Sequence, residues 1–370
     1  MKSLQLVQKP QLRGAEMFAS QLSTHLNAGG HETILVFVFP GTAELPFTGK
    51  TYHLNGNSSK RLFDKTAWKK LADIIKTEKP DIIQANAGDT LKYAISSKLW
   101  FRWKQPVVFR NASTISLYIK SLPAKIFHGF YFRFTDLIIS VSSASAIDFA
   151  NVFPKYKNRI VTIPIGIEEP GLEHVSRPEK TEDRPLRIIH VGGFSFEKNH
   201  KGLISIFEKL VKSGYHAGLE LVGNGVLKAE TEQLVLEKGL QDKVLFHGFR
   251  NDAMQLIKQA DVLVLPSIIE GLPGVILEAF YCKIPVVAYN VGGISEILIN
   301  DKTGYLVEKN NEDAFAEAII KTAQGNNTEI IQNAYNLVNR EYLNTRISKK
   351  FLTAYQDLII QNHPDSAAIK

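Results

Sequence analysis

The chain of 370 residues carries 44 Lys and Arg against 37 Asp and Glu, and 44% of its residues are hydrophobic. This composition excludes a mini-protein and a disordered chain. Cys282 is the only cysteine, which excludes an intrachain disulfide and a Cys-cluster zinc site. No uncharged apolar run approaches the ~20 residues that span a bilayer, so we expect a cytoplasmic protein.

The positive charge is concentrated in the N-terminal half. Residues 1–170 contain 22 Lys and Arg against 12 Asp and Glu, whereas residues 171–370 contain 22 against 25. Such an excess favours a polyanion, an anionic membrane surface or a phosphorylated substrate as partner. Charge alone does not choose among the three.

Short apolar runs alternate with amphipathic stretches along the whole chain, which is typical of βαβ units and a parallel sheet. In the first half the predicted strands are Lys2–Val7, Thr33–Val38, Asp81–Gln84, Pro106–Phe109, Asp136–Val141 and Arg159–Ile163. The predicted helices lie near 15–29, 60–78, 90–101, 118–134 and 143–152. In the second half the predicted strands are Arg187–Val191, Gly218–Val222, Lys243–His247, Asp261–Leu265, Ile284–Ala288 and Gly304–Val307, and a last helix covers about Ser348–Gln361.

One linker divides the chain. Glu169–Pro185 mixes prolines and charges with almost no periodic apolar positions. We therefore predict an α/β protein with two doubly wound, Rossmann-like domains facing each other across a cleft, at 1–168 and 187–345, with a linker at 169–186 and a terminal segment at 346–370. Ligands of such sheets bind beyond the carboxyl ends of the strands.

The segment Pro266–Phe280 carries the strongest motif. Glu270 lies in the loop after a predicted strand, and Glu278 lies about two turns into a helix that Pro273 opens. The backbone at this helix start can bind a phosphate through N–H groups and the helix dipole, over Gly271, Leu272, Pro273, Gly274 and Val275. A diphosphate between two hydroxyl-binding carboxylates describes a nucleotide sugar. The alternative is a pair of solvated surface carboxylates.

This segment resembles the Glu-x7-Glu signature of the retaining glycosyltransferases of family four, which have the GT-B fold. Gly292–Ile297 follows where that family has a Gly-Gly-x-x-Glu turn. Three more segments are similar to the family in the same order: Val191–Asn199 to its phosphate-binding loop, Leu221–Gly225 to its second-strand Gly-x-Gly, and Val244–Phe249 to the loop that holds the base.

The resemblance implies roles for these residues. Glu270 would bind hydroxyls of the donor sugar, Glu278 those of the ribose, and Lys198 would neutralise the diphosphate leaving group. Gly193, Asn224 and Phe249 would contribute to donor binding. For Lys198 the alternative is an ordinary solvated lysine. In GT-B proteins the final helix crosses back to the N-terminal domain, so we expect the same of residues 346–370.

Two departures from the family pattern concern a cation of the phosphate-binding loop and a candidate residue for the reaction centre. Family members usually carry an Arg where this chain has Gly193, and Lys201, His200 or Arg250 are candidates to compensate. Relatives commonly place a histidine where Arg110 and Asn111 stand, which makes these two residues acceptor-side candidates with a structural role as the alternative.

The turn Gln11–Met17 resembles the family's glycine turn under the donor phosphates, but only Gly14 of the glycine pair is present. A glycine there lets the backbone approach a ligand. A plain tight turn is the alternative.

We expect no metal and no cofactor, because the sequence has neither His-x-x-x-His nor Asp-x-Asp and the resembling enzymes work without a divalent ion. The substrate would be a nucleotide-diphosphate sugar, with UDP or GDP favoured over ADP. Nucleic acid is not an expected partner, since no nucleic-acid-binding module is recognisable.

Two stretches, Lys98–Lys104 and Tyr118–Phe134, interleave aromatic and cationic residues. This pattern suits a face lying in a lipid headgroup layer, which would place the protein peripherally on the inner face of the plasma membrane. The alternative is that the aromatic residues fill the core of the N-terminal domain.

Together these features predict a retaining, metal-independent glycosyltransferase of hexosyl or N-acetylhexosaminyl type (EC 2.4). It would move a sugar to a glycan or lipid-linked acceptor in cell-envelope polysaccharide biosynthesis, such as capsule, O-antigen, lipopolysaccharide or exopolysaccharide. The alternatives are a nucleotide-sugar epimerase or phosphorylase of the same fold, and a non-catalytic carbohydrate- or polyanion-binding protein.

Overall fold

The computed structural model describes residues 1–60, 63–169, 171–172, 175–176 and 184–362. The chain forms two compact units, which are described separately. The first unit consists of Met1–Glu168 and the last helix, and the second of Glu169–Leu343.

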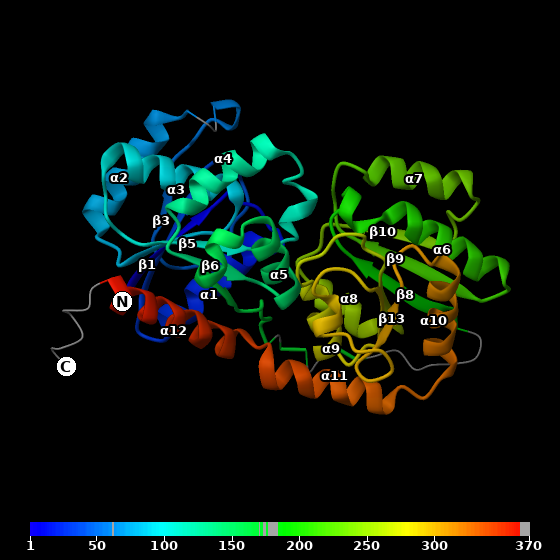
Figure 1. The fold of residues 1–370 in the computed structure, drawn as a ribbon. Helices are drawn as coiled ribbons and strands as arrows, with labels where there is room; N and C mark the ends of the chain where they lie inside the picture. The colour runs from blue at the N-terminus through cyan, green and yellow to red at the C-terminus, as the bar shows by residue number, and fades with distance from the viewer. Residues whose placement is uncertain (61–62, 170, 173–174, 177–183, 363–370) are drawn as a thin grey trace. The chain divides into compact units, whose positions relative to one another are not determined.

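The first unit is built on a seven-stranded sheet in which all strands are parallel, in the order β3-β2-β1-β4-β5-β6-β7 (Figure 1). The strands are β1 (Lys2–Val7), β2 (Glu32–Phe37), β3 (Thr51–His53), β4 (Ile82–Ala85), β5 (Val107–Asn111), β6 (Leu137–Ser140) and β7 (Ile160–Thr162). The strands β4, β5 and β6 are buried along their whole length, which explains why most of their residues are apolar.

Helices cover both faces of this first sheet. They are α1 (Gly14–Ala28), α2 (Lys65–Glu78), α3 (Gly88–Phe101), α4 (Leu122–Arg133), α5 (Ser143–Val152) and α12 (Asn344–Asn362). Helices α2 to α5 contribute to one core cluster, and α1 and α12 pack together in the cluster on the opposite side.

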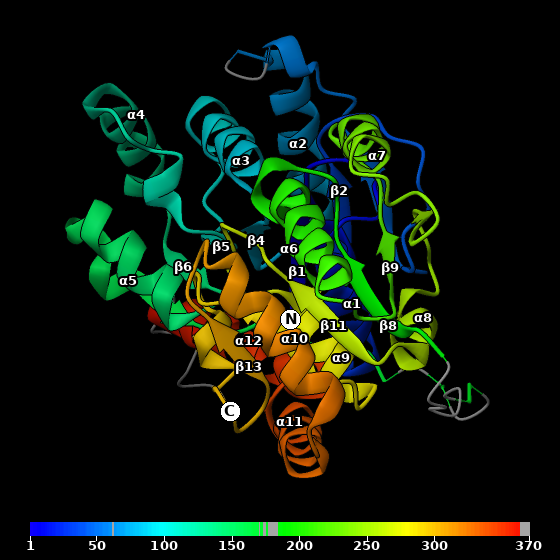
Figure 2. The ribbon, with the colours of Figure 1, turned by 90° about the vertical axis from the view of Figure 1, so that its right-hand side faces the viewer.

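The second unit has a six-stranded parallel sheet in the order β10-β9-β8-β11-β12-β13. Its strands are β8 (Leu186–Val191), β9 (Ala217–Val222), β10 (Val244–Gly248), β11 (Val262–Leu265), β12 (Val286–Tyr289) and β13 (Tyr305–Val307). Its helices are α6 (His200–Lys212), α7 (Lys228–Glu237), α8 (Ala253–Gln259), α9 (Gly274–Tyr281), α10 (Glu312–Gln324) and α11 (Thr328–Glu341). Helices α6 and α10 lie side by side on the sheet (Figure 2).

The predicted fold class, two doubly wound parallel sheets, is confirmed. Each of the twelve predicted strands overlaps an observed one, and β3 was not predicted. The helix expected from 60 begins at Lys65, and the helix expected from 118 begins at Leu122. Much of the predicted linker, at 170, 173–174 and 177–183, lies outside the described residues, and β8 already begins at Leu186.

Among the residues that the structure describes, none of the helices combines the length and apolarity needed to cross a membrane.

Candidate functional site

The order of the strands in the second sheet identifies the place where a ligand would bind. β8 and β11 are neighbours, yet the chain leaves β8 toward β9 and leaves β11 toward β12, on opposite sides. At such a switch point the two connections run in opposite directions and leave a crevice between them. Ligands of doubly wound sheets bind there, outside the carboxyl ends of the strands. The loops are 192–199 after β8 and 266–273 after β11.

Two predicted catalytic residues meet at this switch point. The Lys198 Nζ lies 2.6 Å from the Glu270 Oε1, and the two side chains are 22% and 10% exposed. The backbone ties their loops together, because the Ile268 N–H donates to the Glu197 carbonyl at 2.8 Å. A cation and a carboxylate are therefore held within reach of one ligand.

Asn199 fixes the loop that carries Lys198, and sequence reasoning missed it. Its backbone is left-handed, with φ at 54°, a conformation that Asn tolerates better than most residues. Its side chain accepts from the Gly202 N–H at the start of α6 (3.2 Å) and donates to the Pro266 carbonyl (3.1 Å). An Asn immediately before an apolar-periodic helix is the helix-capping signal that would have identified it.

Two glycines allow the loops to approach closely. Gly292 has φ at 57°, and a Cβ built there would lie 1.9 Å from the Glu270 carbonyl oxygen. The Gly293 N–H also donates to the Gly271 carbonyl (2.8 Å). Gly223 has φ at 145°, and its Cβ would lie 2.0 Å from the Gly192 carbonyl oxygen. A side chain at either position would separate the loops of the candidate site.

The remaining donor-binding candidates of the second unit lie at the same edge of the sheet. The Phe194 N–H donates to the Asn224 carbonyl (3.1 Å), which joins the loops after β8 and β9. The Gly223 N–H donates to the Gly248 carbonyl (2.8 Å), and the exposed Phe249 follows directly. The structure thus brings the loops after β8, β9, β10 and β11 together.

Helix α9 begins beside Glu270. Leu272 is buried, Pro273 is the N-cap in an extended conformation, and the Ile276 N–H donates to the Pro273 carbonyl (3.3 Å). The N–H groups of Gly274 and Val275 belong to the first turn, where a helix has no internal acceptors. This turn is the part of the segment that could bind a phosphate.

Glu278 lies only just over one turn into α9, because the helix begins at Gly274; the predicted distance of two turns was wrong. The residue keeps part of its surface exposed. Burial of the carboxyl nevertheless raises its pKa to about 7. Such a group is partly protonated near neutral pH and can either accept or donate a hydrogen bond.

His200 and Arg250, two candidates to replace the cation that is missing at Gly193, lie in different surroundings. His200 is buried and stacks on Phe194 with ring centroids 4.0 Å apart, and burial lowers its pKa to about 2, so it is neutral. Arg250 forms two hydrogen bonds with Asp252, at 2.7 and 2.6 Å. At Gly193 itself a Cβ would meet only the Asn224 carbonyl oxygen, at 3.5 Å, so a larger residue would have room.

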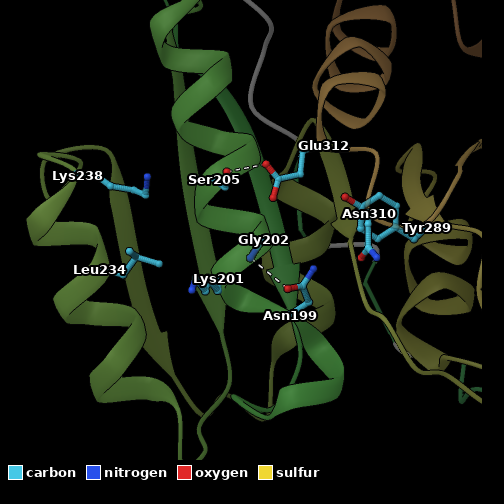
Figure 3. Close-up of a pocket in the computed structure, with 9 residues that line it drawn as sticks. All are labelled: Asn199, Lys201, Gly202, Ser205, Leu234, Lys238, Tyr289, Asn310 and Glu312. Carbon is cyan, nitrogen blue, oxygen red and sulfur yellow. Dashed lines mark hydrogen bonds between the residues drawn. The ribbon is translucent and has the colours of Figure 1, made fainter. Parts of the chain in front are cut away.

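Lys201 lines a different pocket, of about 350 Å³ (Figure 3). The residues that line it come mainly from α6, α7 and the start of α10: Asn199, Lys201, Gly202, Ser205, Leu234, Lys238, Tyr289, Asn310 and Glu312. The Ser205 hydroxyl donates to Glu312 across it (2.7 Å). Lys198 and Glu270 are not part of this lining, and of the loops of the switch-point site it includes Asn199.

Arg110 and Asn111, the acceptor-side candidates, are buried in the first unit. The Arg110 guanidinium lies 4.2 Å from the centroid of the Phe18 ring, and burial lowers its pKa to about 10. The Asn111 amide donates to the Ser140 hydroxyl (3.2 Å) and to the Ser145 carbonyl (3.3 Å). The contacts of Asn111 support the structural alternative for that residue. Arg110 differs, because its Nε and Nη1 are among the buried nitrogens of the described residues that have no hydrogen-bond partner.

Gly14, also in the first unit, is the first residue of α1. A Cβ there would meet nothing within 4 Å, so the turn itself does not require glycine. The space leaves room for a ligand to approach, as the resemblance implies.

Sequence comparison decides the family. A model described as "Glycosyltransferase Family 4" matches residues 12–169, and one described as "Glycosyl transferases group 1" matches residues 173–337. The chain belongs to the group 1 glycosyltransferases. Their GT-B architecture of two Rossmann-like domains agrees with the two parallel sheets.

Individual relatives of this glycosyltransferase are distant. An uncharacterized glycosyltransferase of Methanocaldococcus jannaschii is 29% identical over 59% of this chain and 59% of its own length. The N-acetylgalactosamine-N,N'-diacetylbacillosaminyl-diphospho-undecaprenol 4-alpha-N-acetylgalactosaminyltransferase of Campylobacter jejuni is 29% identical over 58% of this chain and 60% of its own. The similarity thus spans less than two thirds of these curated relatives.

Among solved structures, Anabaena HepE in complex with UDP and glucose is similar with a TM-score of 0.79 and 20% identity, over 96% of this chain and 99% of its own. At this identity the likeness establishes the fold of the glycosyltransferase.

Within the part of the chain that the structure describes, no group of three or more His, Cys, Asp or Glu is arranged to hold a metal ion. Metal independence stays a prediction.

Proposed function

We propose that the protein is a retaining glycosyltransferase that moves a sugar from a nucleotide-diphosphate sugar to a glycan or lipid-linked acceptor. The observation that carries the proposal is the Lys198–Glu270 pair at the β8/β11 switch point, beside the first turn of α9. In the proposed mechanism Lys198 and the N–H groups of that turn stabilise the charge that develops on the leaving diphosphate. Glu270 orients the sugar through its hydroxyls, and Glu278 binds the ribose.

Retention requires that the acceptor hydroxyl attack the face from which the diphosphate departs. A phosphate oxygen of the donor would take the proton of the acceptor, since the proposal assigns Glu270 to the sugar and Glu278 to the ribose. Lys198 is then the residue that holds the leaving group in place during the attack, and Glu270 acts without forming a covalent intermediate.

UDP is the nucleotide that we propose first. Solved structures of the similar HepE contain UDP with glucose and UDP-glucose. For the sugar we propose a hexose or N-acetylhexosamine, and for the setting the assembly of envelope polysaccharide. The Campylobacter relative is named for a diphospho-undecaprenol-linked substrate, and an Escherichia coli relative for colanic acid biosynthesis.

The ion pair leads to a specific test. Glu270 pairs with Lys198, which is the cation that the proposed mechanism assigns to the diphosphate. Glu270→Ala should therefore lower the rate of sugar transfer roughly a hundredfold or more. UDP should bind to this variant at least as tightly as to the wild type. The release of UDP from a panel of UDP-sugars measures both transfer and the slow hydrolysis of the donor. Titration calorimetry measures the affinity for UDP.

The control is Glu237→Ala, an exposed carboxylate on α7 that should change neither quantity. Unchanged turnover in Glu270→Ala would overturn the assignment. Analysis of the products distinguishes an epimerase, which would convert the donor alone, from a phosphorylase, which would need inorganic phosphate.

A further inference from the structure

Helix α4 of the first unit packs on one side only. The helix has a defined start, since the Ala124 N–H donates to the Ser121 hydroxyl (3.3 Å) and proline stands in its first turn. Only Tyr131 and Phe132 of its residues are buried. Phe132 anchors it through ring contacts with Phe149 and Phe153, at centroid distances of 4.8 and 5.0 Å. Figure 2 shows α4 at the margin of the first unit, beside α3 and α5.

The outward side of α4 is apolar. Leu122, Ile126 and Phe130 are 70%, 68% and 50% exposed. They are spaced four residues apart, so they form one line along the helix, which we call the α4 stripe. Single exposed apolar residues are ordinary, but a line of large ones on one helix indicates a surface that something covers.

The charges that the segment around the stripe itself carries are of one sign. Lys120, Lys125 and Arg133 are exposed beside it. The segment 112–135 contains no Asp or Glu. The occupant therefore presents negative charge to the cations and an apolar interior to the stripe. A second copy of the chain, bound by two-fold symmetry, would bring its own cations close to these cations, and the like charges would repel each other.

We propose that the α4 stripe with Lys120, Lys125 and Arg133 docks on an anionic lipid bilayer. An amphipathic helix buries its apolar face at the level of the headgroups, and cations at its flanks add electrostatic attraction to anionic lipids. This inference deepens the proposed function, because a lipid-linked acceptor would be met at such a surface. The docking itself needs no turnover.

The test is flotation of the full chain with vesicles. Wild type should bind vesicles of phosphatidylcholine with phosphatidylglycerol, and bind vesicles of phosphatidylcholine alone at least tenfold less. Ile126→Glu with Phe130→Glu should lower binding to the anionic vesicles more than tenfold. Lys120→Gln with Lys125→Gln should lower it by roughly fivefold for each cation, and high salt should weaken the wild type in the same way.

The matched control is Val226→Glu with Leu236→Glu in the second unit, where the replaced residues are 91% and 58% exposed and binding should not change. Phe130→Trp gives an independent readout, because brominated lipids should quench it more strongly than the native tryptophans of the wild type. Calorimetry with UDP on every variant reports separately on the proposed function. The proposal would be overturned if the wild type failed to bind anionic vesicles, or if Ile126→Glu with Phe130→Glu bound them equally well. It would also be overturned if the wild type were a dimer and this variant a monomer.

Discussion

Glu278 is the candidate-site residue whose charge depends most on pH. Burial raises the pKa of its carboxyl to about 7, whereas the unfolded chain has the ordinary value near 4.5. The folded state therefore binds a proton that the unfolded state releases above pH 4.5. Its stability relative to the unfolded chain is greatest below that pH and falls as the pH rises through 7.

Glu278→Gln should remove this part of the pH dependence. The amide keeps the shape of the side chain and carries no charge at any pH, so the variant should gain up to about 3 kcal/mol of unfolding free energy relative to the wild type between pH 5 and pH 8. Urea titration of both chains across this range measures the difference. Parallel curves for the two chains would contradict the shifted pKa.

The sequence identifies which residues could carry the chemistry better than it identifies where their side chains point. Glu270 and Lys198 lie in loops after strands, and any doubly wound sheet collects such loops at one edge. Arg110 is different, because it lies within β5 and its direction depends on strand alternation. Its side chain lies against Phe18 of α1, in contact with a core to which α12 contributes. No local pattern around residue 110 contains that information.

At the scale of elements, the turn at Gly292 supports the loop that carries Glu270. Gly292→Ala would place a methyl group 1.9 Å from the Glu270 carbonyl oxygen and would also force alanine into φ 57°. We expect a loss of about 3 kcal/mol of stability, combined with weaker donor binding. Thermal unfolding and calorimetry with UDP-glucose measure the two effects.

Gly239→Ala is the matched control for this prediction. Gly239 has φ at 64°, but its Cβ would meet nothing within 4 Å. The control should lose only the strain of a left-handed alanine, about 1 kcal/mol, and retain donor binding. Equal losses in the two variants would show that the contact with Glu270 has no influence on the site.

The elements themselves are predictable where burial produces a clear sequence pattern. Strand β1 has the predicted bounds, and its apolar residues Leu4, Leu6 and Val7 are buried together with the polar Ser3 and Gln5. β3 was missed because three residues at the edge of a sheet, Thr51–His53, form no apolar run. Helix α12 begins at Asn344, four residues before the predicted start, and the Asn344 amide donates to the distant Glu168 (2.7 Å). A contact across half the chain leaves no local periodicity.

At the scale of the molecule, the chain completes the core of the first unit with its last helix. Phe351 and Tyr355 of α12 are fully buried in the cluster that includes α1. The Tyr355 hydroxyl donates to Gln84 on β4 (2.6 Å) and accepts from Gln5 on β1 (3.1 Å). The first unit therefore cannot be completed until the second has been synthesised.

Truncation after Arg346 should consequently unfold the first unit. It removes Phe351 and Tyr355 and thereby exposes the apolar surface of α1. The buried side chains of Gln5 and Gln84 also lose their hydrogen bonds with the Tyr355 hydroxyl. Hydrogen exchange should show β1 and β4 losing protection while β8 and β11 retain it.

Tyr355→Phe should have a milder effect than the truncation. The variant should lose about 1–3 kcal/mol of unfolding free energy, because only the hydroxyl is lost. Ile360→Ala, at an exposed position of the same helix, should leave β1 and β4 protected. If the truncated chain protects β1 and β4 as the full chain does, the core of the first unit does not depend on α12.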